Sequence, residues 1–237
     1  MKEMASLTKI KNKKHEHTTL EQKLNTLRAG VLGSNDGILT VVGVLFSVAV
    51  ATSNRFTIFI AGLADLLACA FSMASGEFAS VSTQKDTEKA AVMKEQRLLK
   101  QNYAQEVQTV AAYYHEQGVT HETAIEIARE LMQKKPLETL TDVKYNLKLG
   151  QYMNPWDAAV ASLISAMLGG VFPLAAMTLS PANYMWQATI FAVCLSVSLT
   201  GYLSAKLGNG LVKIAILRNL LIGILTMIIH YSVGILL

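Results

Sequence analysis

Residues 57–80 read TIFIAGLADLLACAFSMASGEFAS, and this stretch decides the fold. At about 1.5 Å per residue, roughly 20 apolar residues in a helix cross the hydrocarbon core of a bilayer. The stretch is long enough to do so, yet it carries Asp65 in its middle and Glu77 near its end. Ionisable side chains at membrane depth are energetically costly, and those found there usually serve a site or a pathway. The stretch therefore predicts a transmembrane helix that carries functional groups.

One face of this helix is small or polar, and Met73 lies at the edge of that face. It comprises Asp65, Cys69, Ser72, Gly76 and Ser80. The opposite face consists of Leu, Ile, Ala and Phe, which suits lipid or a neighbouring apolar helix. A membrane helix with one polar, carboxylate-bearing face is typical of a pathway lining.

The whole chain has the composition of an integral membrane protein. Of its 237 residues 51% are hydrophobic and 16% are charged, and the apolar residues cluster in long runs. The runs span about 31–52, 57–80, 154–178, 182–205 and 213–237. Both cysteines fall inside such runs, so no disulfide framework is indicated. The fold class predicted is an all-α membrane protein with five transmembrane helices.

The distribution of Lys and Arg predicts the orientation of the spans. Basic residues gather in the leading tail, between the second and third runs, and between the fourth and fifth. The other two loops hold only Arg55. All basic segments lie on one side if the N-terminus is cytoplasmic and the C-terminus outside. The predicted parts are a cytoplasmic tail (1–30), helices one and two (31–80), a cytoplasmic helical domain (81–153) and helices three to five (154–237).

The domain 81–153 is expected to contain three helices. Neither Gly nor Pro occurs from Glu77 to Gln117, so the second span is predicted to continue as one helix to Gln117. Thr120 is the expected N-cap of a second helix. Pro136 is expected to open a third helix over 137–149. Three helices of this size bury little surface, so we expect the domain to pack against a second copy of itself.

A second acid, Asp36, lies among glycines just inside the first span. It lies about six residues from the start, and Met73 about seven residues from the end of the next span, so both are roughly 8–10 Å deep. Asp65 lies about 12 Å further in than Met73, and Glu77 about 6 Å further out. Oxygen ligands with one soft sulfur suit Fe²⁺, or Mn²⁺ by its preference for oxygen. These four residues are the candidate metal ligands of the membrane region.

Structural roles are the alternative for each of these residues. Asp36 could cap a broken helix start, and Asp65 could form a hydrogen bond between helices. Met73 could fill space, and Glu77 could reach the membrane surface. Two acids at mutually consistent depths favour the functional interpretation, because intramembrane acids usually have a function.

Glutamates of the long cytoplasmic helix form a further candidate site. Glu88, Glu95 and Glu106 fall on one helix face, where they would stabilise a bound cation. An ordinary solvated face is an equally good interpretation. The sequence has no phosphate-binding loop and no nucleophile–base pair, which argues against an enzyme. The formal net charge of +4 is explained by orientation in the membrane and gives no indication of nucleic-acid binding.

Three stretches resemble the vacuolar iron transporter family. They are GSNDGILTVVGV (33–44), AGLADLLACAFSMASGEFASVSTQKDTE (61–88) and NPWDAAVASLISAMLGGVFPL (154–174). The resemblance implies a five-span homodimer with a cytoplasmic three-helix metal-binding domain. It also implies movement of Fe²⁺, and in some members Mn²⁺, out of the cytosol in exchange for protons. Asp36, Asp65 and Met73 match the pathway residues of the family.

The cytoplasmic domain departs from the family pattern. Related metal sites carry two Glu-x-x-Glu pairs, and Glu95 and Glu106 match the first member of each pair. The second members fall on Leu98 and Thr109. The third-helix ligands fall on Asp142 and Asn146. The resemblance therefore implies a degenerate site with weak metal binding.

These observations predict a proton-coupled exporter of Fe²⁺ or Mn²⁺ that acts as a homodimer in a lipid bilayer. Metal and protons are the substrates, and no cofactor is expected. The alternative is a non-transporting metal sensor or scaffold that retains the fold. The compact chain, without an organelle signal, resembles a bacterial-type member and favours a bacterial cytoplasmic membrane over a vacuolar one.

Overall fold

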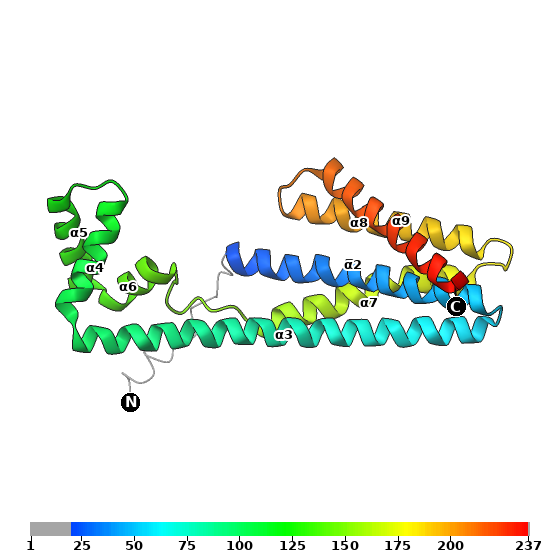
Figure 1. Ribbon diagram of the computed structural model, residues 1–237, viewed down its shortest axis with the longest axis horizontal. Coiled ribbons are helices and arrows are strands. Elements are labelled where there is room, and N and C mark those ends of the chain that lie inside the picture. The colour runs from blue at the N-terminus through cyan, green and yellow to red at the C-terminus, as the bar shows by residue number, and fades with distance from the viewer. Residues whose placement is uncertain (1–19, 237) are drawn as a thin grey trace, which may run out of the picture. The chain divides into compact units, whose positions relative to one another are not determined.

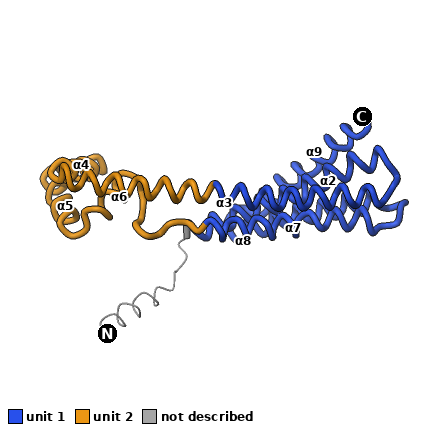
Figure 2. Tube along the Cα trace, turned by 90° about the horizontal axis from the view of Figure 1, so that it is seen from below, with its two compact units in different colours: residues 1–79, 155–237 blue, residues 80–154 orange. Residues whose placement is uncertain are grey.

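The structure is a computed structural model that describes residues 20–236, and the helices fall into two units (Figure 2). One unit comprises the described residues up to Ala79 together with those from Pro155 onward. The other comprises Ser80–Asn154 and is called the 80–154 unit below. The helices of the described range are α2 (Leu20–Ala51), α3 (Arg55–Gln101), α4 (Tyr103–Glu116), α5 (His121–Lys134), α6 (Pro136–Tyr145), α7 (Pro155–Leu179), α8 (Met185–Leu207) and α9 (Val212–Leu236).

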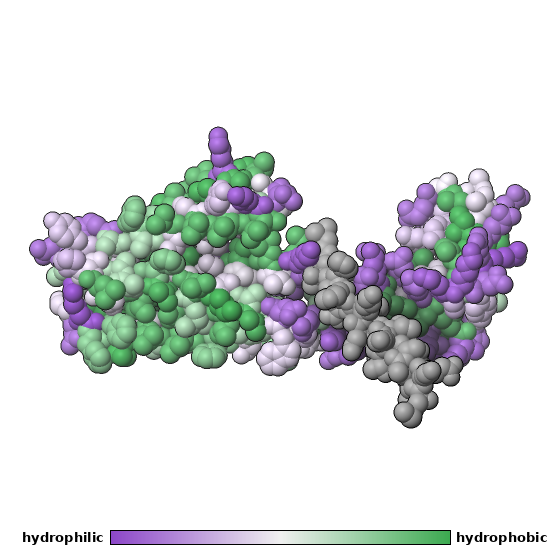
Figure 3. Space-filling model, turned by 180° about the vertical axis from the view of Figure 1, so that it is seen from behind, coloured by the Kyte–Doolittle hydropathy of each residue, from purple (hydrophilic) through white to green (hydrophobic). Residues whose placement is uncertain are grey.

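Five of these helices, α2, α3, α7, α8 and α9, are long and apolar enough to cross a membrane. Figure 3 shows apolar side chains over most of the visible face of the first unit, with hydrophilic side chains at its two ends. Shorter helices connect the second and third spans. This confirms the predicted fold class, an all-α multi-pass membrane protein with five spans.

The central helix of the membrane unit is α2, which packs against α7, α8 and α9 (Figure 1). Its residues Ile38, Val41 and Leu45 are almost completely buried. Leu66 of α3 and Leu174 of α7 belong to the same apolar cluster. A helix that is apolar on several faces fits such a central position.

Small residues bring α2 and α7 into close contact. A Cβ atom added at Gly33 would lie 2.6 Å from the carbonyl oxygen of Ser162, and one at Gly37 would lie 2.9 Å from Cα of Ala166. Small residues allow the backbones of membrane helices to approach in this way. The glycines around Asp36 therefore serve close packing, because α2 runs unbroken past them.

Loop contacts show which helix ends lie together. The guanidinium of Arg55 donates a hydrogen bond of 2.5 Å to the carbonyl of Ser180, so the connections 52–54 and 180–184 share one end of the unit. Gly208, after α8, lies near Leu27 at the start of α2. Successive spans therefore alternate in direction, as the apolar runs predicted.

Two helix boundaries differ from prediction because single asparagines interrupt the helical backbone. The helix expected to reach Gln117 ends at Gln101, since Asn102 adopts φ −140° and ψ 50° and α4 begins after it. The third helix ends at Tyr145 and does not reach residue 149, because Asn146 has φ 53°. Asparagine tolerates this left-handed conformation better than most residues.

Two other expectations about boundaries have clear outcomes. Thr120 is the N-cap residue of α5, as predicted, although its hydroxyl bonds to Thr123 and not to the helix backbone. The helix that contains the first apolar run begins at Leu20, before the start of that run at about residue 31. The part of the predicted tail before Leu20 lies outside the described residues.

Candidate metal site

The structure places the two predicted membrane acids near a common thiol. Asp36 lies on α2 and Asp65 on α3, and both are partly buried. Cys69, about one helical turn after Asp65, interacts electrostatically with both carboxylates and lies beside the Thr40 side chain. The sequence analysis matched the depth of Asp36 to that of Met73 and placed Asp65 about 12 Å deeper, so it did not predict a thiol near both acids. Sulfur ligands favour transition metals over Mg²⁺ or Ca²⁺.

Several buried oxygens in this region lack hydrogen bonds. The Oδ2 atom of Asp65, the Oδ1 atom of Asn35 and the Oγ1 atom of Thr40 have no partner among residues 20–236. Within the same residues neither Asp36 nor Asp65 forms an ion pair. A buried oxygen without a partner costs about 1–3 kcal/mol, which water or a cation would relieve. The region therefore offers acceptors, and negative charge, to an incoming ion.

The outer acid of the predicted series has a partner of its own. Glu77 on α3 is buried, and its Oε2 atom accepts a hydrogen bond of 3.1 Å from the guanidinium of Arg28 on α2. The sequence analysis did not single out Arg28. Arg28 lies in the helix of the first span, close to the expected depth of Glu77. This position could have indicated an ion pair between the two residues. Met73 lies one turn before Glu77 on α3 and is partly buried.

In the 80–154 unit, Glu95 of α3 and Glu106 of α4 converge on Lys144 of α6. The Lys144 ammonium donates to Glu95 Oε2 at 2.8 Å and to Glu106 Oε2 at 2.5 Å. Burial favours the neutral amine, but the hydrogen bonds to Glu106 and Glu95 and their charges outweigh it and raise the pKa of Lys144 above the usual lysine value. The side chain is therefore a cation at neutral pH.

Lys144 and its neighbour Tyr145 were missed by the sequence analysis. The Tyr145 hydroxyl donates a hydrogen bond of 2.8 Å to Glu95 Oε1, which raises the pKa of this tyrosine. The family pattern had directed attention to Asp142 and Asn146 on the same helix. A lysine in a lysine-rich segment carries no sequence signal that distinguishes it from a solvated residue.

A single chain does not assemble a complete ligand set. Among the described residues, no three His, Cys, Asp or Glu side chains are grouped closely enough to hold one metal ion. Cys69 thus lies within electrostatic range of Asp36 and of Asp65, but the three side chains do not form one coordination sphere. Further ligands would have to come from water, from Met73 or from another copy of the chain.

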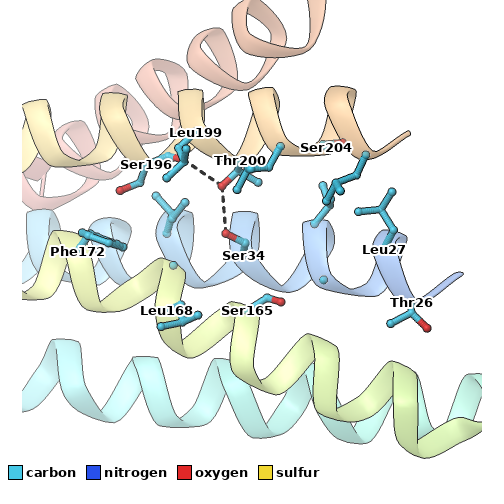
Figure 4. Close-up of a pocket in the computed structure, with 16 residues that line it drawn as sticks. Thr26, Leu27, Ser34, Ser165, Leu168, Phe172, Ser196, Leu199, Thr200 and Ser204 are labelled. Atoms are coloured by element: carbon cyan, nitrogen blue, oxygen red, sulfur yellow. Dashed lines mark hydrogen bonds between the residues drawn. The ribbon is translucent and has the colours of Figure 1, made fainter. Parts of the chain in front are cut away.

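A separate pocket of about 490 Å³ lies between α2, α7 and α8 (Figure 4). Aliphatic side chains and hydroxyl groups line it, and Ser34 Oγ lies 3.1 Å from Thr200 Oγ1. No lining residue is ionisable. Ser34 and Asp36 are about 200° apart around α2, so the pocket is on the other side of this helix from the acid. The pocket therefore does not belong to the candidate metal site.

Comparison with known proteins identifies the family. The model of the VIT family matches residues 27–235. The chain belongs to the VIT family. The match covers all five spans and the helices α4–α6.

Relatives with assigned names support this membership. A vacuolar iron transporter of Acanthamoeba castellanii is 34% identical over 211 residues, which cover 88% of this chain and 77% of that protein. Vacuolar iron transporter homolog 3 of Arabidopsis thaliana is 31% identical over 207 residues, which cover 87% of this chain and 80% of that protein. Homolog 2 of Oryza sativa is 30% identical over 211 residues, covering 87% and 88%. VIT proteins are transporters, which confirms the predicted family and the prediction that the chain is not an enzyme.

Proposed function

We propose that this VIT protein exports Fe²⁺, and also Mn²⁺, from the cytosol across its membrane in exchange for protons. The observation that carries the proposal is the pair of acids, Asp36 and Asp65, beside one thiol in the membrane helices. Neither acid has a basic partner among residues 20–236. The names of the relatives supply iron as the first metal to test.

The coupling to protons follows from the cost of exposing carboxylates to low dielectric. Two negative charges in this region are stable only with a cation or with protons bound. Metal and protons compete for the same oxygens, because a carboxylate must lose its proton to bind metal. The site then releases the metal on one side of the membrane, binds protons there and returns in its protonated form. Metal is thereby exchanged for protons. Asp36 and Asp65 perform both steps in this scheme.

Soft ligands would set the metal preference. Met73 supplies a thioether on α3, on the side of Asp65 toward Glu77, and Cys69 lies beside the acids. Thioether and thiol ligands bind Fe²⁺ better than Mg²⁺ or Ca²⁺, which require oxygen alone. The proposed site therefore rejects the abundant hard cations.

A second copy of the chain would complete the site. Part of the polar face of α3, at Ser72 and Gly76, is not packed within one chain, because a Cβ atom at Gly76 would meet nothing within 4 Å and Ser72 is exposed. Small polar residues are typical of contacts between membrane helices and are poorly suited to lipid. A twofold homodimer through α3 would cover this face and bring two sets of acids together. The oligomeric state by light scattering tests this part.

The basic residues support the proposed orientation. The end of the unit with Arg28 and Lys206 would face the cytosol, together with the 80–154 unit, and the end with Arg55 would face outward. We assign the bacterial cytoplasmic membrane as the location, with the vacuolar membrane as the alternative.

Metal uptake into proteoliposomes tests the proposal. Purified protein should take up Fe²⁺ and Mn²⁺ but not Mg²⁺ when the lumen is acidic relative to the bath. If the protein is instead a metal sensor or scaffold, the purified protein should bind metal but the proteoliposomes should take up none. Uptake of Mg²⁺ at the rate of Fe²⁺ would contradict the assigned ligands.

Replacing Met73 with Leu keeps the volume and removes the sulfur. We expect the Fe²⁺ uptake rate to fall about tenfold, as one lost ligand of about 1.4 kcal/mol would produce, and the Mn²⁺ rate to fall less. Rates for both metals in the same vesicle preparation provide the comparison. Equal losses for the two metals would show that Met73 serves packing alone.

A further inference from the structure

The polar cluster of the 80–154 unit joins its helices. Glu95 lies on α3, Glu106 on α4, and Lys144 and Tyr145 on α6. The Glu95 side chain is 1% exposed and that of Glu106 is 8% exposed. Two carboxylates this deeply buried are stable only with compensating charge and hydrogen bonds.

Lys144 supplies that charge from within the chain. Its ammonium bridges one oxygen of each carboxylate, and Tyr145 donates to the second oxygen of Glu95. Both oxygens of Glu95 are thereby used.

The position of the ammonium is one that a divalent ion could occupy. Its nitrogen lies 2.8 Å and 2.5 Å from the two carboxylate oxygens. Divalent cations bind carboxylate oxygens at about 2.0–2.6 Å, so a small inward shift of both acids would bring them onto one ion. A cation and the ammonium cannot occupy this place together.

We infer that Lys144 is the resident cation of the 80–154 unit: its ammonium occupies the place where Glu95 and Glu106 would otherwise bind a divalent metal. The unit is closed by an internal ion pair and needs no metal to hold α3, α4 and α6 together. The inference concerns this unit alone and holds whether or not the membrane helices transport metal.

Mn²⁺ binding to the full-length protein in detergent tests the inference. All variants carry Asp36→Asn, so that binding in the membrane unit is suppressed, and bound Mn²⁺ is measured by electron paramagnetic resonance. We expect the parent to show no saturable Mn²⁺ site that depends on Glu95. Adding Lys144→Met should create one Mn²⁺ site per chain, at least tenfold tighter than any parent binding, and adding Glu95→Gln should remove it.

Thermal stability gives a second readout. Lys144→Met should lower the apparent melting temperature by about 5 °C without metal, because it leaves two buried acids unpaired. Mn²⁺ should restore it, whereas the melting temperature of the parent should not respond. Lys148→Met is the matched control, because Lys148 is exposed and forms no ion pair among the described residues.

Two results would overturn the inference. One is a saturable parent site that Glu95→Gln abolishes, because the acids would then bind metal in spite of Lys144. This measurement does not require the Lys144 variant to fold. The other is a folded Lys144→Met protein that gains no Mn²⁺ binding.

Discussion

Asp36→Asn should reduce Fe²⁺ uptake into proteoliposomes to background, by about a hundredfold or more. The amide is nearly the same size as the carboxylate but carries no charge. Two unit charges 4 Å apart interact by about 4 kcal/mol at an effective dielectric constant of 20, which corresponds to nearly a thousandfold. No basic side chain among residues 20–236 pairs with Asp36, so the substitution leaves no unpaired cation behind. The variant should therefore fold normally.

Asp86→Asn is the matched control for this prediction. It makes the same chemical change at an exposed acid of the 80–154 unit. Its uptake rate should stay within twofold of the original protein, and both variants should elute at the same position in size-exclusion chromatography. Normal uptake by a folded Asp36→Asn protein would remove this residue from the proposed mechanism.

Gly37→Ala should destabilise the membrane unit strongly. The added Cβ atom would lie 2.9 Å from Cα of Ala166 on α7, and backbone atoms there cannot rotate away. The two helices must separate, because the clash is with backbone atoms. Overpacking costs about 1–3 kcal/mol, and the gain of about 1 kcal/mol in helix propensity offsets only the lower end of this range. We expect a clear fall in the temperature at which the detergent-solubilised protein aggregates, and a lower yield of folded protein.

Gly223→Ala distinguishes this effect from a general cost of adding a methyl group. A Cβ atom at Gly223 on α9 would lie 3.4 Å from the side chain of Val197, an ordinary contact distance. This variant should equal or exceed the original protein in aggregation temperature and yield, because only the gain in helix propensity remains. If Gly37→Ala were equally stable, the close contact of α2 with α7 would not be a requirement of the fold.

The internal cations separate the acids into two groups. Glu77 pairs with Arg28, and Glu95 and Glu106 share Lys144. Asp36 and Asp65 have no such partner within the described residues. An acid already neutralised by a basic side chain must lose that partner before it binds metal, which lowers its apparent affinity. The unpaired acids are therefore the better candidates for the transported ion.

Much of this architecture could be predicted because apolar run length alone decides which segments span a membrane. The acids Asp36 and Asp65 stood out for the same reason, since charge is rare at such depth. The break at Asn102 could not be predicted, because the sequence on both sides of it is typical of a helix. The backbone conformation of this one residue ends α3. Lys144 was equally hidden, because its role depends on α6 packing against α3 and α4.

Proton movement during metal uptake tests the central claim most directly. Proteoliposomes loaded with a pH-sensitive dye should show the lumen becoming alkaline as Fe²⁺ enters, at a rate that follows metal uptake and vanishes in Asp65→Asn. Fe²⁺ entry at an unchanged rate without any pH change in the lumen would contradict exchange of metal for protons at these acids.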